Sequence, residues 1–333
     1  MRTWPRLVGT ALVLALATAA VSSVLAQAKP DKVTIGYQVI PNEEIVAKAL
    51  GWHEQAMGVK IDWRQFDSGR DVNTAMAAGS VDIGLVGSSP AAAGIAAGVP
   101  YEVFWIYDVI ADNEALAAKK GRGIRSVKDL EGKKVAAPFG STTHYHLLVA
   151  LKEGGVDPKK VTILDMQPPD MLAAWTRGDL DAGFVWEPTL VKMIEGGGEV
   201  LVPSKQLAEK GYLTADVAVV RKAFAAKYPQ LVTTYVRTLS RAVSFYREQP
   251  QEAAKAVAKA FNLSEQEALR QMKTMVFLDA REHATEKYLK GGLAKALKDA
   301  ADFLESQKVI KRAPPLSAYR KAVVSTYAEQ AAR

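Results

Sequence analysis

Short apolar runs alternate with segments of helical periodicity through the first two thirds of the chain, and this alternation limits the fold more than any other feature. Strands separated by helices pair in parallel, so a mostly parallel sheet covered by helices is expected. In the first series, strands are predicted at 32–37, 59–66, 81–87 and 102–110, and helices at 42–52, 70–79 and 89–98.

A second series of the same kind begins near residue 126, where Ser126 and Asp129 have the spacing of a helix capping box. Strands are predicted at 133–138, 161–166 and 180–186, and helices at 143–155 and 171–178. The two series also resemble each other, because four residues of 77–90 recur 99 positions later in 176–188: Gly79, Asp82, Gly84 and Val86 match Gly178, Asp181, Gly183 and Val185. Two related α/β lobes are therefore expected.

The composition changes after about Val220. Segments 221–248, 251–261, 264–273 and 292–307 have apolar residues three and four apart, which predicts amphipathic helices. This helical tail has no predicted strand of its own, so we expect it to pack on one of the lobes.

Composition excludes several kinds of site. The 333 residues include no cysteine, so disulfides, thiolate metal ligands and cysteine nucleophiles are absent. The formal charge of +7 is scattered, without a basic block, so no nucleic-acid partner is expected. His144 and His146 are spaced by two, which is a poor arrangement for a metal pair on a helix. Neither a metal nor a cofactor is expected.

The first 28 residues have the pattern of a secretory signal peptide. Arg2 and Arg6 precede an apolar stretch, and small residues follow it, with cleavage expected near Ala26 or Ala28. An uncleaved anchor is the alternative, although the apolar stretch is short and rich in alanine. We therefore expect a periplasmic protein, released from the inner membrane.

Polar side chains follow the predicted strands, at the edge where open α/β sheets bind ligands. We take the following as candidate ligand-binding residues: Gln38, Ser88, Ser89, Glu114, Ser141, Thr142, Thr143, His144, Trp186 and Glu187.

Two of these stretches, GSSP (87–90) and GSTTH (140–144), stand at predicted helix starts. Ordinary helix capping is one explanation for their hydroxyl groups. A site for a negatively charged group is the other, because free N–H groups and the helix dipole favour an anion there. The occurrence of both stretches in matching lobes favours the anion site.

Four blocks, GSSP, PFGSTTHYHLL, LDMQPPDMLAAWTRGDLDAGFVWEP and DVAVVRKAF, resemble the taurine-, alkanesulfonate- and nitrate-type periplasmic binding proteins of ABC importers. The taurine-binding members are the most similar, from about Lys32 to Lys227. The resemblance implies a type II periplasmic-binding fold with two hinged α/β lobes. Lobe 1 would comprise residues 29–115 and 219–333, including the helical tail, and lobe 2 residues 116–218.

The resemblance also implies roles for single residues. A sulfonate would lie against Ser88, Ser89, Thr142, Thr143 and His144, and Trp186 would close over the ligand. Asp216 matches an acidic position that would pair with the ligand ammonium, assisted by Glu114 or Glu187. Two positions depart from the pattern: Ala218 replaces a tryptophan, and Glu187 replaces a small residue, and these changes would favour a longer or more cationic ligand.

The expected function is capture of taurine or a related small sulfonate and its delivery to an ABC permease in the inner membrane, by a monomer without catalytic residues. Three alternatives stay open: another small anion or amine, such as nitrate, a longer alkanesulfonate or a thiamine precursor; an enzyme on the same fold; and the sensor lobe of a receptor. The signal peptide and the absence of cysteine argue against the enzyme.

Overall fold

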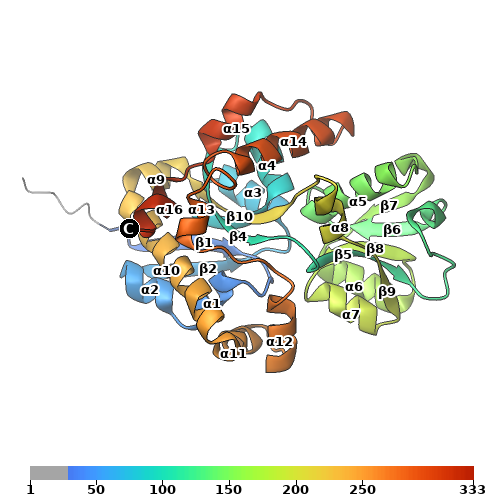
Figure 1. Ribbon diagram of the computed structural model, residues 1–333, viewed down its shortest axis with the longest axis horizontal. Coiled ribbons are helices and arrows are strands. Elements are labelled where there is room, and N and C mark those ends of the chain that lie inside the picture. Colours follow the sequence, from blue (N-terminus) through green and yellow to red (C-terminus); the bar gives the residue numbers. More distant parts are fainter. Residues whose placement is uncertain (1–28) are drawn as a thin grey trace, which may run out of the picture.

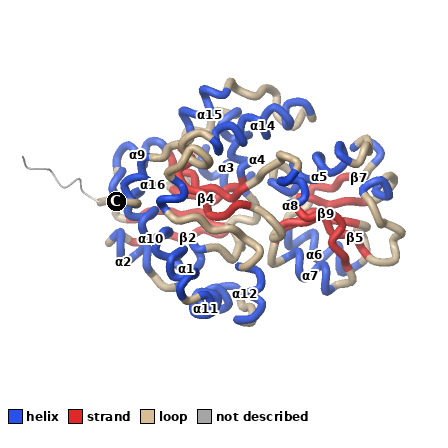
Figure 2. The backbone as a smooth tube through the Cα atoms, in the orientation of Figure 1, coloured by secondary structure: helices blue, strands red, loops and turns tan. Residues whose placement is uncertain are grey.

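The computed structural model describes residues 29–333, so the predicted signal peptide and its cleavage sites at Ala26 and Ala28 lie outside the described residues. Two lobes lie side by side, each built around one five-stranded sheet with helices outside it (Figures 1 and 2). The predicted two-lobed α/β architecture is confirmed.

The first lobe contains a mixed sheet in the order β2-β1-β3-β10-β4. Strand β10 is antiparallel to both of its neighbours, while β1 pairs in parallel with β2 and β3. The strands are β1 (Lys32–Tyr37), β2 (Lys60–Gln65), β3 (Ile83–Gly87), β4 (Tyr101–Val109) and β10 (Ala215–Arg221), and the helices between them are α1 (Glu43–Ala49), α2 (Trp52–Met57), α3 (Gly69–Ala77) and α4 (Ser88–Ala96).

The second lobe repeats this plan in the order β7-β6-β8-β5-β9, with β5 as its antiparallel strand. Its strands are β5 (Glu114–Lys119), β6 (Lys134–Ala137), β7 (Thr162–Asp165), β8 (Ala182–Trp186) and β9 (Gly198–Pro203). Its helices are α5 (Thr142–Glu153), α6 (Pro168–Arg177), α7 (Thr189–Glu195) and α8 (Ser204–Glu209), with short 3-10 turns at Val127–Leu130 and Pro158–Lys160.

The internal repeat has a structural basis at its two aspartates. The Asp82 carboxylate accepts the N–H of Thr34 at 2.9 Å, and the Asp181 carboxylate accepts the N–H of Lys134 at 2.9 Å. Each aspartate thus connects the central strand of its sheet, β3 or β8, to the parallel strand beside it, β1 or β6. The same local sequence gives the same connection in both lobes.

The chain crosses between the lobes twice. It leaves the first sheet at Val109 and enters the second at Glu114, and it returns after α8 to enter β10 at Ala215. The expected divisions after residues 115 and 218 thus fall inside β5 and β10, a few residues from the crossings. Strands β5, β9 and β10 were not predicted. Strand β5, EALAAK (114–119), has the composition of a helix, whereas the valines of β9 and β10 are typical of strands and could have indicated them.

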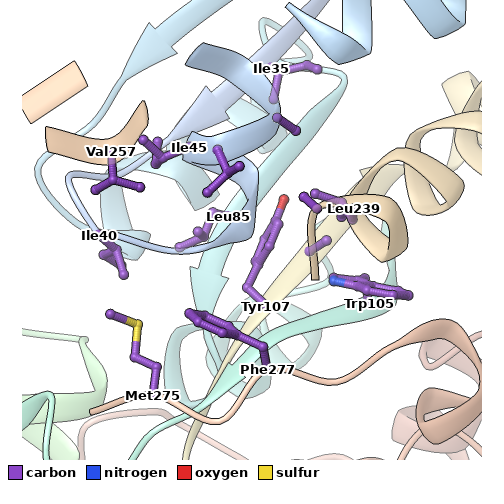
Figure 3. Packing of buried hydrophobic residues seen from close by; sticks show 14 of the residues in the cluster. Ile35, Ile40, Ile45, Leu85, Trp105, Tyr107, Leu239, Val257, Met275 and Phe277 are labelled. Carbon is purple, nitrogen blue, oxygen red and sulfur yellow. The ribbon is translucent and has the colours of Figure 1, made fainter. Parts of the chain in front are cut away.

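The helical tail packs on the first lobe, as predicted. Leu239 of α10 and Val257 of α11 are fully buried with Ile35, Leu85 and Trp105 of the sheet (Figure 3). The tail also covers the edge strand β4, through isolated bridges of Val276 and Val323, so that edge is not open to another chain. Its helices are α9 (Lys222–Lys227), α10 (Pro229–Glu248), α11 (Pro250–Phe261), α12 (Glu265–Met272), α13 (Ala280–His283), α14 (Gly292–Ser306), α15 (Leu316–Ala322) and α16 (Thr326–Ala331).

Within residues 29–333, none of the helices combines the length and the apolar composition that crossing a membrane requires.

Candidate functional site

A narrow cavity lies between the lobes, at the carboxyl ends of the parallel strands. Its empty space is small, about 240 Å³ including the part that is open to solvent. Both lobes line it, through Gln38, Ile40, Gly69, Gly87, Pro90, Glu114, Ser141, Thr142, Trp186 and Asp216.

Six of the predicted site residues are therefore brought together at one cavity: Gln38, Glu114, Ser141, Thr142, Trp186 and Asp216. The other five are buried next to these but do not line the cavity: Ser88, Ser89, Thr143, His144 and Glu187. Ala218 does not line it either, because it lies deeper in β10, paired with Leu85 and Trp105 inside the core.

Three helix starts converge on the cavity. Helices α4 and α5 come from different lobes and nearly touch, since a Cβ added at Gly87 would lie 2.6 Å from Cγ2 of Thr142. The start of α3 joins them, because a Cβ on Gly69 would lie 3.3 Å from the backbone nitrogen of Gly87. The first N–H groups of a helix have no partner inside it, and the helix dipole adds partial positive charge there. The arrangement favours a negatively charged group.

The hydroxyl groups at these helix starts differ in their hydrogen-bond partners. Ser141 is the N-cap of α5 and accepts the N–H of His144 at 3.1 Å, so ordinary capping accounts for this residue. Thr142 instead donates to the Glu114 carboxylate at 2.6 Å. Ser88 accepts the N–H of Ala215 at 3.2 Å, whereas the buried hydroxyl of Ser89 has no partner among the described residues.

His144 is held as a neutral ring behind the cavity. Its ring stacks on Phe139 with centroids 4.5 Å apart, and its Nδ1 accepts the N–H of Gly140 at 3.3 Å. Burial lowers the pKa of His144 to about 4, so it brings no positive charge to an anion at neutral pH.

Two buried carboxyl groups line the cavity, one from each lobe. Asp216 lies near the start of β10, and Glu114 is the first residue of β5. Because these two strands run antiparallel to their neighbours, their first residues lie where the parallel strands end. Burial raises the pKa of Asp216 to about 7 and raises that of Glu114 well above its usual value.

Two further carboxyl groups, of Asp108 and Glu43, lie close behind these two and were missed by the sequence analysis. Both are fully buried, and Trp105 donates its indole N–H to Glu43 at 2.9 Å. The signal that could have found Asp108 is a single acid inside the apolar strand EVFWIYDVI (102–110). A lone acidic residue in a buried strand needs a polar partner. Asp108 lies opposite Asp216, which lines the cavity.

Glu187 has protein partners of its own. Its carboxylate accepts the N–H of Val191 at 3.0 Å and pairs with the Arg270 guanidinium of α12 at 3.1 Å. Arg270 belongs to the helical tail, so this ion pair joins the first lobe to the second. Burial raises the pKa of Glu187, and Arg270 opposes that rise.

The lobes also touch elsewhere around the cavity. Arg70 at the start of α3 pairs with Asp165 of β7 at 2.7 Å, and Gln167 donates to Ser68 at 3.2 Å. With the Glu187–Arg270 pair, these contacts hold the lobes together on more than one side of the cavity.

A second, larger cavity borders the first at Trp186, which lines both. Its empty volume is about 640 Å³, and most of its wall is apolar, with Phe66, Pro168, Leu172 and Pro188 among the lining residues. Lys192 and Asp67 supply the charged part of the wall.

No group of three or more potential metal-ligating side chains forms a metal site within residues 29–333. A narrow cavity lies between two lobes that are joined by two crossing segments, and helix starts and carboxyl groups line it. This is the arrangement of a two-lobed solute-binding protein.

The chain belongs to the NMT1/THI5-like family, whose sequence model matches residues 42–253. It is 38% identical to the taurine-binding periplasmic protein of Escherichia coli over 296 residues, which cover 87% of this chain and 91% of that protein. The predicted resemblance is thereby confirmed.

Solved structures share the fold at low sequence identity. The alkanesulfonate-binding protein SsuA from Xanthomonas axonopodis pv. citri, bound to MOPS, matches with a TM-score of 0.73 and 23% identity, over 90% of this chain and 98% of that one. The desulfurization enzyme DSZB matches with a TM-score of 0.65 and 15% identity, over 91% of this chain and 100% of that one. The type II periplasmic-binding fold is thus confirmed, and it also occurs in an enzyme.

Proposed function

We propose that this protein captures taurine, or a closely related small aminosulfonate, in the periplasm and delivers it to an ABC permease of the inner membrane. The observation that carries the proposal is the lining of the narrow cavity, which joins helix starts to buried carboxyl groups and includes no lysine, arginine or histidine among the described residues.

The helix starts of α3, α4 and α5 suit the sulfonate. A sulfonate has three acceptor oxygens and a permanent negative charge, which the free N–H groups and helix dipoles stabilise without a basic side chain. Thr142 and Ser141 also line the cavity at this place, and their hydroxyl groups donate to the Glu114 carboxyl group and to the Pro138 carbonyl.

The carboxyl groups suit an ammonium and disfavour a purely anionic ligand. An ammonium gives an ionised carboxylate of Asp216 or Glu114 a partner in this buried space, whereas a purely anionic ligand offers these groups no opposite charge. Nitrate has no such cation, so it is the poorer candidate. The identity to a taurine-binding relative supports the same choice of ligand.

The test is calorimetric titration of the protein from Lys29 onward with taurine, ethanesulfonate and nitrate. We expect taurine to bind with micromolar affinity or better, about −8 kcal/mol. Ethanesulfonate, which has the sulfonate but no ammonium, should bind at least tenfold more weakly, and Asp216→Ala should abolish taurine binding. Equal affinity for taurine and ethanesulfonate would show that the carboxyl groups do not recognise the ammonium group of the ligand.

A bulkier sulfonate is the second candidate, favoured by the larger cavity beside Trp186. Rotation of this one side chain would join the two cavities and give room to an apolar substituent. Titration with sulfonates of increasing chain length separates the two candidates, because a ligand confined to the narrow cavity loses affinity as the chain grows.

Delivery rests on closure of the lobes. The contacts between Arg70 and Asp165 and between Glu187 and Arg270 exist only when the lobes meet, so a ligand that draws the lobes together favours the form that a permease would recognise.

A further inference from the structure

The buried carboxyl groups at the cavity outnumber the charges that one ammonium can neutralise. Asp216 and Glu114 line the cavity, and Asp108 and Glu43 lie behind it, each at least 96% buried. Among residues 29–333, none of the four takes part in an ion pair with a lysine, arginine or histidine. Most of these groups must therefore hold a proton at neutral pH.

Asp108 and Asp216 form a pair across two neighbouring strands. They stand opposite each other in the register of β4 and β10, at a point where the ladder becomes irregular. Facing each other from paired positions, the two carboxyl groups can form a hydrogen bond only if one of them holds a proton, because two carboxylates offer only acceptors.

The surroundings decide which of the two carries that proton. Asp108 is the deeper residue, it does not reach the cavity, and its buried Oδ1 receives no N–H or O–H donor from the described structure, so this oxygen can itself carry the proton. Its other oxygen accepts only a long bond of 3.5 Å, from Asn113. Burial, together with the negative charges of Asp216, Glu43 and Glu114, raises the pKa of Asp108 well above its usual value.

Asp216, by contrast, faces the cavity and receives the hydrogen bond, which lowers its pKa against the effect of burial and leaves it at about 7. Asp216 is therefore the group that an approaching ammonium can ionise.

We propose that Asp108 is a positioning residue that keeps its proton throughout binding and donates it in a hydrogen bond to Asp216, and that the ligand ammonium displaces one proton from Asp216 into the solvent as it binds. The inference rests on the proposed function, since it requires a ligand with an ammonium group.

The direction of the pH dependence follows from the proton balance. Below about pH 7 the empty site holds a proton on Asp216 that must leave before the ammonium can pair, so affinity falls as pH falls. For one displaced proton with a pKa of about 7, affinity should be about tenfold weaker at pH 6 than at pH 8.

The neighbouring groups do not reverse this direction. Burial also raises the pKa values of Glu43 of α1 and Glu114 of β5, so a proton lost from either of them on binding would change the affinity with pH in the same direction. His283 of α13 bonds to the backbone of β4, and burial lowers its pKa to about 4, so it too stays neutral over this range.

The first test needs no variant. Taurine is titrated into the wild-type protein at pH 7 in phosphate and in Tris, two buffers whose ionisation enthalpies differ widely. The difference between the observed enthalpies gives the number of protons released, which should be about one half per taurine at pH 7. Binding of taurine with no proton release and with equal affinity at pH 6 and pH 8 would overturn the inference and leave the proposed function intact.

Variants then assign the two roles. Asp108→Ala removes the donor, so the midpoint of the pH dependence should move above 7 and affinity at pH 7 should fall about tenfold or more. Asp108→Asn keeps an N–H donor without a carboxyl group, and it should restore affinity relative to Asp108→Ala. Asp216→Asn should abolish both taurine binding and proton release.

The control is Asp112→Asn, a neighbouring carboxyl group that is about half exposed and pairs only with Lys205 at 3.9 Å; it should change neither affinity nor proton release. Thermal unfolding of each variant checks that it folds. If Asp108→Asn folds and loses binding as completely as Asp216→Asn, then Asp108 carries the charge and the inference is wrong. If the wild-type protein binds no aminosulfonate at all, the proposed function and this inference fail together.

Discussion

The ion pair between Glu187 and Arg270 should contribute to ligand affinity rather than to the stability of either lobe. It joins the loop after β8 to helix α12, so it exists only when the lobes meet. Arg270→Met removes the guanidinium and keeps an apolar stem of similar length.

The magnitude follows from the burial of the two partners. An exposed ion pair contributes about 0–1 kcal/mol, whereas a buried charge left without its partner costs about 3–5 kcal/mol. The Glu187 side chain is 4% exposed and that of Arg270 is 46% exposed, so water can partly replace the guanidinium. Glu187 also keeps the N–H of Val191 at 3.0 Å. We therefore expect a loss of about 1–2 kcal/mol, or about 5- to 30-fold in affinity.

Calorimetric titration with the aminosulfonate that binds the wild-type protein measures the loss, and a double-mutant cycle with Glu187→Gln isolates the pair. The matched control is Arg247→Met, because Arg247 pairs with Asp279 at 3.1 Å and Glu282 at 2.7 Å inside the first lobe. That variant should lower the unfolding temperature without changing affinity. Unchanged affinity of Arg270→Met, or an equal loss in Arg247→Met, would refute the argument.

Three further changes test other parts of the structure. Gly87→Ala places a Cβ 2.6 Å from Cγ2 of Thr142, so it should hinder closure and weaken binding about tenfold or more while the unfolding temperature stays near that of the wild type; unaltered affinity in a titration would contradict the close approach of the two helix starts. Thr142→Val removes the 2.6 Å hydrogen bond to Glu114, so the pKa of Glu114 should rise further and affinity should fall about five- to tenfold, with Thr142→Ser expected to retain it. His53→Phe replaces a buried ring that stacks on Tyr235 and has no hydrogen-bond partner in the described structure. Burial lowers the pKa of His53 to about 3 from an ordinary 6.5, so the wild-type protein loses stability as pH falls below about 6.5; the gain in unfolding free energy from His53→Phe should grow by about 2 kcal/mol between pH 8 and pH 5, measured by urea denaturation, and a pH-independent gain would exclude the neutral buried ring.

Sequence patterns alone were enough to predict the two α/β series, their internal repeat and the hydroxyl groups at helix starts. These features are local: the period of the apolar residues selects strand or helix, and a serine or threonine before a helix is recognisable within a few residues. The repeat around Asp82 and Asp181 was visible for the same reason, since each aspartate acts on the strand beside it.

The pairing of charged groups, by contrast, depends on the folding of distant segments. Arg270 stands 83 positions from Glu187, and Asp108 meets Asp216 through the pairing of β4 with a strand that returns from the other lobe. Strand β5 could not be predicted for a similar reason, because its strand conformation comes from its neighbours in the sheet rather than from its own alanine-rich composition. In a folded protein, burial and segments distant in the chain determine which partner a charged group has and what its pKa is. The residues next to that group in the sequence indicate neither.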